Sequence, residues 1–374
     1  MTSDVGTREQ VRIYRRGRDR RMLKKEQVQF PAVTKELYNE QKNESIVFSM
    51  RPFASGDEQG LLECIRDEYG DSYFKRDFYD VGKLREKAMG EHYVFFVAEA
   101  GGEIAGMEIF ALFTENGDDY IEPASQILKQ KYRGFGLAAE LVAYTFPLAK
   151  MMEPQALFVH AVTFHTITQR VCGEQGMVPT GFRLGSFLAE KMHNSYPKGN
   201  CPKHSEGIMI LPVQKKQAGK VYLPAQLHAY AKNIYDCLGM SYELSDQKES
   251  FSQAHAKLSV VTDELQRTVL IQLLQLGDDL TDQIGKLMNS HTQPLWTYQI
   301  TISSDCPAAL TAYDQLANMG FFFTGIKAAC GTKEQFYMQW CGDMKLHMEE
   351  YMLTGAFDLL RVQIQAFYDR RKCV

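Results

Sequence analysis

The sequence predicts a mixed α/β fold divided between two domains. The chain has 374 residues, enough for about two domains of ~150 residues each. Apolar runs typical of strands alternate along it with segments of helical periodicity. With 45% apolar and 24% charged residues, the composition is that of a globular protein, which excludes a mainly disordered chain.

The first expected domain begins at Ser45, and its elements follow the order β-α-α-β-β-β-α-β-α-β-β. Apolar runs bounded by turn residues predict its strands: Ile46–Phe53, His92–Ala100, Glu103–Phe113, Ile121–Lys129, Ala156–Thr163, Phe182–Phe187 and Gly207–Val213. Apolar residues three or four apart predict its helices: one through Leu61, Leu62 and Ile65, then Asp80–Met89, Gly134–Met151 and Thr166–Gln175.

Local signals support these boundaries. Ser55-Gly-Asp-Glu58 has the pattern of a capping box, which starts a helix. Gly101-Gly102 predicts the tight turn of a hairpin, because glycine adopts positive φ readily. Gly176 follows a helical segment, where a left-handed glycine commonly ends a helix.

The second expected domain continues the alternation of strands and helices. Its expected strands are Lys257–Thr262, Thr268–Leu276, Thr297–Ile302, one that begins at Phe321, and Gln335–Trp340. Its expected helices are Asp278–Met288 and Pro307–Asn318. Val221–Asn233 begins as a strand and continues as a helix, and His347–Arg371 is a helical tail. Gln175–Gly181 and Met319–Gly325 share a helix end, a glycine, an apolar strand and a final Thr-Gly. The sequence therefore predicts an internal repeat.

Residues 1–44 form a basic arm, because arginine and lysine dominate from Arg8 to Lys25. Such a run binds nucleic acid, lipid headgroups or an acidic partner, or packs as a solvated arm on the protein's own acidic surface. The net charge of −4 argues against general polyanion binding, so nucleic acid is not the expected partner.

Several protein classes are excluded by what the sequence lacks. No apolar run reaches the ~18 residues of a membrane helix, and the arginine-rich N-terminus has no apolar core of a secretory signal. The eight cysteines form no CxxC pair, which indicates reduced thiols of a cytoplasmic protein and no bound metal.

Residues 131–138 (KYRGFGLA) place two glycines between an expected strand and an expected helix. Glycine lets the backbone approach a ligand closely, and the first N–H groups of a helix favour an anion such as a pyrophosphate. A Rossmann fingerprint needs a third glycine where Ala139 stands, and a P-loop needs a lysine and a Ser/Thr that are absent.

In this context the chain resembles the GNAT acyltransferase superfamily. Four segments carry the resemblance over about Ser45–Gln214: Arg51-Pro52 before a capped helix, the hairpin Val94–Phe113, the loop Gln130–Gly136, and His165–Met177. The resemblance implies an acyl-CoA co-substrate, acetyl or longer, and no metal. It also implies direct attack on the thioester by a primary amine of a small molecule or peptide. The acidic body of the protein favours a cationic acceptor.

The resemblance also implies which residues hold the donor. The pyrophosphate would lie against Lys131, Tyr132, Arg133, Gly134, Phe135, Gly136, Leu137 and Ala138. Backbone N–H groups near Gln126, Ile127 and Leu128 would bind the acyl carbonyl, and His165 would also contact the donor.

A general base is expected on or beside the fourth strand of the first domain. Glu122 is the first candidate, and its alternative role is a solvated carboxylate at a strand edge. His160 and His165 are alternative bases, although a lone histidine near a strand end is often structural. Asp118, Asp119 and Tyr120 form either a wall of the acceptor site or a plain turn.

Three positions depart from the family pattern. Lys131 stands where glutamine or arginine is usual, and His165 where asparagine is usual. Cys172 occupies the position of the tyrosine that often protonates the leaving thiolate. A thiol with an ordinary pKa of ~8.5 could serve as that acid, but Cys172 could also be a small buried helix residue.

The second half, residues 217–374, is expected to be a degenerate GNAT-like domain in tandem with a catalytic one at 45–216. At the position of the glycine loop it has Leu276-Gly-Asp-Asp-Leu280, whose carboxylates would repel a pyrophosphate. Two functions stay open: an N-acyltransferase, or a non-catalytic regulator that binds acyl-CoA or a partner. Assembly into oligomers is also left open.

Overall fold

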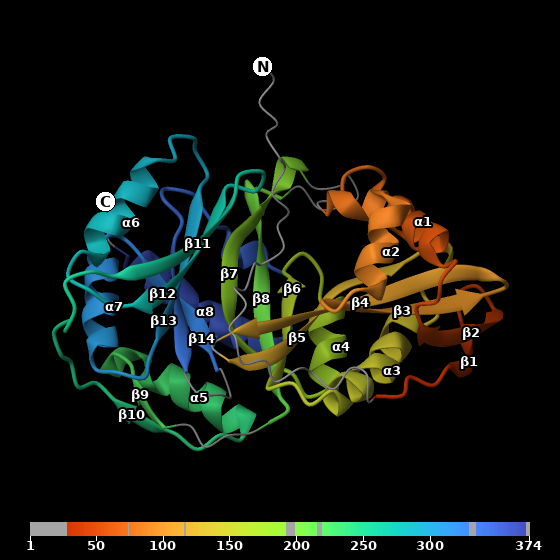
Figure 1. Cartoon of the computed structure of the whole chain (residues 1–374), viewed down its shortest axis with the longest axis horizontal. Coiled ribbons are helices and arrows are strands. Elements are labelled where there is room, and N and C mark those ends of the chain that lie inside the picture. The colour runs from red at the N-terminus through yellow and green to blue at the C-terminus, as the bar shows by residue number, and fades with distance from the viewer. Residues whose placement is uncertain are drawn as a thin grey trace.

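The computed structural model describes residues 28–73, 75–115, 117–191, 199–214, 219–328 and 334–371. The basic run from Arg8 to Lys25 lies outside these residues. In the described part of the chain, thirteen strands form one continuous mixed sheet, in the order β1-β2-β3-β4-β5-β6-β8-β7-β14-β15-β13-β12-β11. Helices cover both faces of this sheet (Figure 1). The mixed α/β fold is therefore confirmed.

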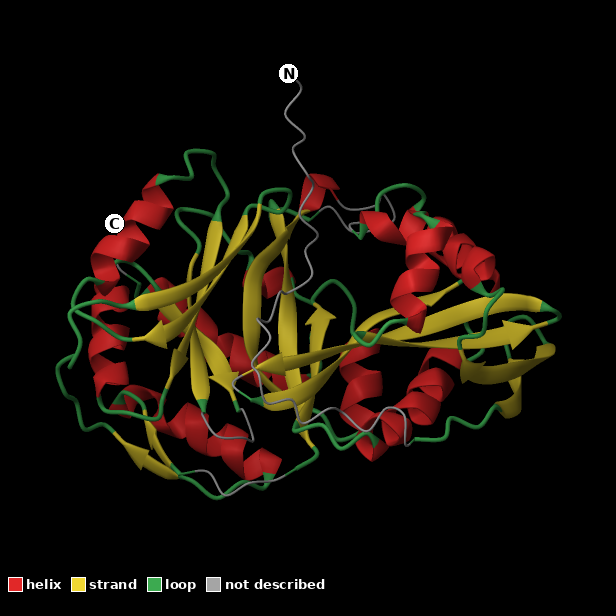
Figure 2. Cartoon of the chain, viewed as in Figure 1, coloured by secondary structure: helices red, strands yellow, loops and turns green. Residues whose placement is uncertain are grey.

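The first half supplies eight of these strands: β1 (Val33–Asn39), β2 (Glu44–Pro52), β3 (Tyr93–Ala100), β4 (Glu103–Glu115), β5 (Asp118–Leu128), β6 (Ala156–Val162), β7 (Val178–Leu188) and β8 (Lys203–Pro212). Its helices are α1 (Glu58–Tyr69), α2 (Val81–Met89), α3 (Leu137–Met151) and α4 (Ile167–Glu174). α1 and α2 cover one face of the sheet, and α3 and α4 cover the other (Figures 1 and 2).

The second half supplies β11 (Lys257–Asp263), β12 (Thr268–Gln275), β13 (Thr297–Ser303), β14 (Phe322–Lys327) and β15 (Gln335–Trp340). Its helices are α5 (His228–Leu238), α6 (Leu280–Asn289), α7 (Ala308–Asn318) and α8 (Gly355–Asp369). The short strands β9 (Lys220–Tyr222) and β10 (Glu243–Ser245) form a separate parallel pair.

The strand order of the second half repeats that of the first in reverse across the sheet. From the centre outward, β7, β8, β6, β5 and β4 on one side correspond to β14, β15, β13, β12 and β11 on the other. In both series the fourth strand from the centre runs parallel to the third, and a helix connects them. The repeat expected from the Thr-Gly segments is thus visible in the topology.

The two halves meet where β7 and β14 pair at Gly181 and Gly325. A Cβ on Gly181 would lie 2.4 Å from the carbonyl oxygen of Thr324 and 2.5 Å from the Cα of Gly325. Gly325 has φ +153°, and a Cβ there would lie 2.6 Å from the Cα of Gly181. The repeated Thr-Gly pairs therefore let two backbones approach more closely than any side chain permits.

Buried polar side chains cross the same junction. Lys203 on β8 is fully buried, and its Nζ donates to the carbonyl oxygen of Arg267 at 3.0 Å and to Thr297 Oγ1 at 3.1 Å. Burial lowers the pKa of this amine to about 7. Glu115, at the end of β4, forms a buried ion pair with Lys327 of β14. One apolar core continues through both halves, so the sheet has no break between them.

Three expectations need correction. Val33–Asn39, assigned to the basic arm, forms β1 and pairs along its length with β2. The N-cap of α1 is Asp57 and not Ser55, and the Asp57 carboxylate accepts the N–H of Ala54 at 2.7 Å and pairs with Arg51.

The C-terminal helix is the third correction, because α8 begins only at Gly355 and not at His347. The preceding residues are held in contact with the first half. The N–H of Met352 donates to the carbonyl oxygen of Thr163 at 2.7 Å, and the N–H of Thr354 donates to the Gln169 side chain at 3.0 Å.

Candidate active site

The parallel strands β5 and β6 separate soon after they meet. Their ladder pairs Tyr120 with Ala156 and Ile121 with Leu157, although β5 continues to Leu128. The glycine loop follows the far end of β5, and α3 begins directly after it. The two strands thus branch after Ile121 and Leu157, and we call this position the branch point. The opening between the strands widens from there toward the N-terminus of α3.

The glycine loop presents backbone to open space. Gly136 has φ +79°, and no heavy atom lies within 4 Å of where its Cβ would be. α3 begins at Leu137, so the N–H groups of Leu137 and Ala138 have no acceptor inside their own helix. The helix starts three residues later than the sequence predicted, because Gly134 and Gly136 both adopt left-handed conformations.

Aromatic side chains fix this loop to the core. Tyr132 and Phe135 are both buried, and each ring contacts Phe48 of β2 edge to face. Gly134 lies against Asn39, at the end of β1, so closely that a Cβ would come within 2.7 Å of Asn39 Nδ2. The side chains of Tyr132 and Phe135 therefore anchor the loop, and their role in holding a pyrophosphate stays a prediction.

The basic side chains of the loop are already paired. Lys131 forms an ion pair with Glu103, and Arg133 forms one with Glu68. Hydrogen bonds from Lys131 and Tyr132 hold the pKa of Glu103 at about 2. An anion at this loop would therefore be bound mainly by backbone N–H groups, with Lys131 and Arg133 shared between it and these carboxylates.

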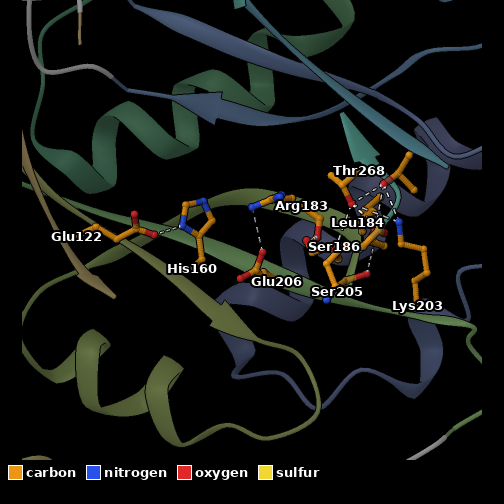
Figure 3. A network of polar contacts seen from close by, with 12 residues as sticks. Glu122, His160, Arg183, Leu184, Ser186, Lys203, Ser205, Glu206 and Thr268 are labelled. Carbon is orange, nitrogen blue, oxygen red and sulfur yellow. Dashed lines mark hydrogen bonds and ion pairs between the residues drawn. The ribbon is translucent and has the colours of Figure 1, made fainter. Parts of the chain in front are cut away.

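Glu122 and His160 meet where β5 and β6 separate (Figure 3). His160 Nδ1 lies 2.7 Å from Glu122 Oε1, and both side chains are largely buried. When Nδ1 carries the proton and donates it to the carboxylate, Nε2 is left as the acceptor. This is the arrangement of a general base oriented by a carboxylate. The sequence offered Glu122 and His160 separately and did not predict the pair.

Buried aromatic residues pack beside this pair. Tyr120 stacks on Phe113, and Phe158 lies edge to face with Tyr120 and next to His160. The ammonium group of Lys327, from the second half, lies 5.9 Å from the centre of the Tyr120 ring. Tyr120 thus belongs to this buried group. Asp119 instead accepts a hydrogen bond from Thr114 and serves the turn.

Glu206 and Arg183 continue the line of polar side chains from His160 toward the second half (Figure 3). Arg183 Nη1 lies 3.6 Å from Glu206 Oε2, and the Glu206 side chain is buried. Glu122 of β5 and Glu206 of β8 therefore lie on the same side of the sheet as His160. Arg183 offsets the charge of Glu206, so Glu122 is the carboxylate beside His160 that would attract a positively charged molecule.

His165 and Cys172 lie apart from the Glu122–His160 pair in the hydrogen-bond network. His165 follows β6, and its buried Nδ1 has no hydrogen-bond partner among the described residues. Burial lowers the pKa of His165, which favours the neutral imidazole. Cys172 is buried in α4, and burial raises the pKa of its thiol well above the ordinary value. This favours the structural role for Cys172, because a thiol with a raised pKa is a weak acid.

A β-bulge interrupts β5 before the residues predicted to bind the acyl carbonyl. Ile109 pairs with Ser125 and Phe110 with Pro123, so Ala124 is the extra residue. A bulge leaves its extra residue outside the regular ladder. Ala124 therefore joins Gln126, Ile127 and Leu128 as a candidate donor for a carbonyl oxygen. The Gln126 side chain donates to the carbonyl oxygen of Ala138 at 3.0 Å and ties β5 to α3.

Glu108 is a buried carboxyl on β4, behind the opening, and Thr145 donates a hydrogen bond to it at 3.0 Å. Burial raises its pKa to about 8, and hydrogen bonds from Thr145 and Gln126 oppose that shift. The unfolded chain loses this proton near pH 4.5, so folding stability falls as the pH rises from about 4.5 to 8.

We expect Glu108→Gln to remove this loss, because the amide stays neutral. The variant should match the wild type below pH 4.5 and exceed it above pH 8, by on the order of 4 kcal/mol in the free energy of unfolding. Urea unfolding at several pH values measures the difference. An equal difference at every pH would contradict the assigned protonation.

The corresponding place in the second half is closed. The ladder between β12 and β13 runs without a split from Thr268–Thr297 to Gln272–Thr301. The N–H groups of Asp278 and Asp279 donate to the carbonyl oxygens of Gln253 and Ala254. The chain itself therefore occupies the donors that a pyrophosphate would use.

In the described part of the chain, no cluster of His, Cys, Asp and Glu is arranged to hold a metal ion. Among the helices of those residues, none is long and apolar enough to cross a membrane.

Comparison with known proteins gives matches only among solved structures, since no family model and no curated protein matches the sequence. The ribosomal-protein-S18-alanine N-acetyltransferase of Escherichia coli is 13% identical, with a TM-score of 0.35 over 44% of this chain and 94% of that one. An N-acetyltransferase of Staphylococcus aureus is 15% identical, with a TM-score of 0.36 over 44% and 98%. A putative arylalkylamine N-acetyltransferase of the yellow fever mosquito is 14% identical, with a TM-score of 0.37 over 50% and 97%.

Identities and TM-scores this low identify no substrate and carry no argument about function. The chain's own topology is therefore compared with the order of elements that the sequence predicted. Every element that the sequence predicted between Ser45 and Gln214 is present in the predicted order. The bulged β5, its early separation from β6 and the glycine loop before α3 accompany that order. Residues 44–212 therefore have the order of elements that the resemblance to the GNAT superfamily implies.

Proposed function

We propose that the first half of this protein is an acyl-CoA-dependent N-acyltransferase that acylates a primary amine. The observation that carries the proposal is the position of the Glu122–His160 pair. It lies at the branch point of β5 and β6, and the same opening leads to the N-terminus of α3. A thioester held by its pyrophosphate at the helix would extend along the opening toward the base.

The residues present fit an acyl-CoA. Gly136 leaves open space before the first turn of α3, whose N–H groups and dipole favour a pyrophosphate. Leu137 and Ala138 would donate to it. Lys131 and Arg133 would screen its charge. The backbone around Ala124 to Leu128 would hold the acyl carbonyl.

The reaction follows from these positions. His160 Nε2 takes a proton from the acceptor ammonium or amine, directly or through water, and Glu122 stabilises the imidazolium. The amine nitrogen then bonds to the thioester carbon, and the developing oxyanion is held by the backbone N–H groups of β5. The carbon–sulfur bond breaks, and the extra proton on the attacking nitrogen passes through water to the departing thiolate, since the raised pKa of Cys172 makes its thiol a poor donor. His160 then returns its proton to solvent.

The acceptor surface favours a positively charged amine. Glu122 lies beside His160 on this side of the sheet, and the Glu206 carboxylate is shared with Arg183. A small polyamine or a peptide amine would match this combination. The acyl group of the donor is acetyl or longer, and activity measured with a series of acyl-CoA chain lengths would distinguish these donors.

A thiol-release assay tests the proposal. The full chain is incubated with acetyl-CoA or longer acyl-CoA and a panel of amines, and free CoA thiol is measured. Release that depends on both enzyme and amine supports the N-acyltransferase. If acyl-CoA raises the thermal midpoint but no amine consumes it, the protein is the regulator of the alternative hypothesis.

Binding at the loop is tested by two matched substitutions. We expect Gly136→Asp to weaken acyl-CoA binding at least about tenfold, because its carboxylate would face the pyrophosphate. Gly136→Asn has the same shape without the charge, and both residues tolerate left-handed φ, so it should keep most of the affinity. The ligand-induced shift of the thermal midpoint measures both. Equal binding by the two variants would place the pyrophosphate elsewhere.

A further inference from the structure

A cavity of about 410 Å³ lies in the second half, between the end of α6, the start of β13 and the end of β15. Its wall includes His291, Trp296, Tyr298, Trp340, Asp343 and Met344, and we call it the aromatic cavity. Ligand sites in proteins commonly have a volume of this order. It lies away from Gly277, the second-half equivalent of the glycine loop, which precedes the opposite end of α6.

The aromatic rings of the cavity are held in a fixed arrangement. Trp296 stacks on His291 with ring centres 3.9 Å apart, and His291 Nδ1 lies 2.8 Å from the hydroxyl of Tyr298. Trp340 contacts Tyr298 edge to face at 5.6 Å. Because these contacts hold the rings, a ligand would meet preformed aromatic surfaces.

Trp296, in the wall of the aromatic cavity, has an unpaired polar group. The indole N–H of Trp296 is buried and has no hydrogen-bond partner among the described residues. Buried donors are nearly always paired in folded proteins, since an unpaired one loses the free energy of hydration. A ligand that carries a hydrogen-bond acceptor, such as a hydroxyl oxygen, would pair with this donor.

One carboxylate lies in the wall. Among the described residues that line the cavity, Asp343 is the only carboxylate, and no lysine or arginine side chain is part of the lining. Arg267 and Lys203 lie behind the wall, where they donate to the carbonyl oxygens of Pro294 and Leu295. Indole and phenol rings carry negative potential on their faces and attract cations, most strongly when the cation is weakly hydrated. Two methionines, Met288 and Met344, add polarizable apolar surface.

We propose that the aromatic cavity binds a small organic cation of the methylated ammonium class. Methyl groups on the nitrogen would lie against Trp340, the more exposed of the two tryptophans, while Asp343 would balance the charge from the rim. The proposal is independent of acyl transfer, because none of these residues belongs to the opening between β5 and β6. It gives the second half a ligand-binding role of its own.

Tryptophan fluorescence provides a direct test, because the two tryptophans of the chain both line this cavity. Choline is titrated into the full chain, and 3,3-dimethylbutan-1-ol, its neutral carbon isostere, is titrated in parallel. We expect a saturable change in emission with choline and at least about tenfold weaker binding of the neutral alcohol. Equal binding of the two compounds would identify a merely apolar cavity and overturn the proposal.

Substitutions locate the binding. Asp343→Asn should weaken choline binding about fivefold, whereas Asp246→Asn, the same change at a residue outside the cavity, should leave it unchanged. Trp340→Leu should abolish saturable binding, and Trp340→Phe, which keeps an aromatic face, should retain it. Thermal midpoints confirm that each variant is folded. No saturable response from the folded wild type at millimolar choline would also overturn the proposal.

Discussion

Replacing His160 by alanine is expected to lower kcat for amine acylation by about 10²- to 10⁴-fold. The imidazole is the proposed proton acceptor, and its Nδ1 contact of 2.7 Å with Glu122 orients the ring for that task. Alanine removes the base and leaves a buried carboxylate without this partner. Steady-state kinetics with saturating acyl-CoA measures the loss.

Binding of the donor separates a catalytic role from a structural one. We expect the His160→Ala variant to keep the acyl-CoA-induced thermal shift, because the glycine loop lies at the other end of the opening. His255→Ala, at an exposed histidine of the second half, is the matched control and should keep full turnover. Wild-type kcat in the His160→Ala variant would remove His160 from the mechanism and leave Glu122 or His165 as the base.

Replacing Gly181 by alanine is expected to lower the free energy of unfolding by about 3 kcal/mol. The new methyl group would overlap the backbone of Thr324 and Gly325, and neither can move without separating β7 from β14. The two halves share one sheet and one core, so the loss should appear as a single lower unfolding transition. Differential scanning calorimetry measures it.

Gly285→Ala is the matched control for this substitution. Gly285 lies inside α6, with no heavy atom within 4 Å of the Cβ position. Alanine there should raise the free energy of unfolding by about 0.5–1 kcal/mol, because it restricts the unfolded chain and favours a helix. An unchanged thermal midpoint for Gly181→Ala would mean that the junction between the halves is looser than the geometry of β7 and β14 indicates.

Local patterns were sufficient for the order of elements between Ser45 and Gln214. Spacings of two and of three to four residues report which side of a strand or helix is apolar, and they need no knowledge of distant contacts. Gly101-Gly102 illustrates this, since both residues have the positive φ that their turn requires. The boundaries were less exact at Ser55 and His347. Before α8, contacts with the distant residues Thr163 and Gln169 hold the chain outside the helix.

Val33–Asn39 was missed for the same reason. Its burial pattern is mostly exposed, and only pairing with β2 makes it a strand. Its end then supplies Asn39 to support Gly134. A segment that looks like part of a basic arm in the sequence is thus part of the platform beneath the glycine loop.

The sequence by itself determined the mixed α/β fold, the glycine loop before α3 and the internal repeat, because each depends on residues that are neighbours in the chain. Only the tertiary structure decided that Glu122 faces His160 and that Gly181 meets Gly325. It also decided that the second half is closed at its loop and brings Trp296 and Trp340 to one cavity. These pairs are far apart in sequence, and their meeting depends on strand order and register, which no local spacing encodes.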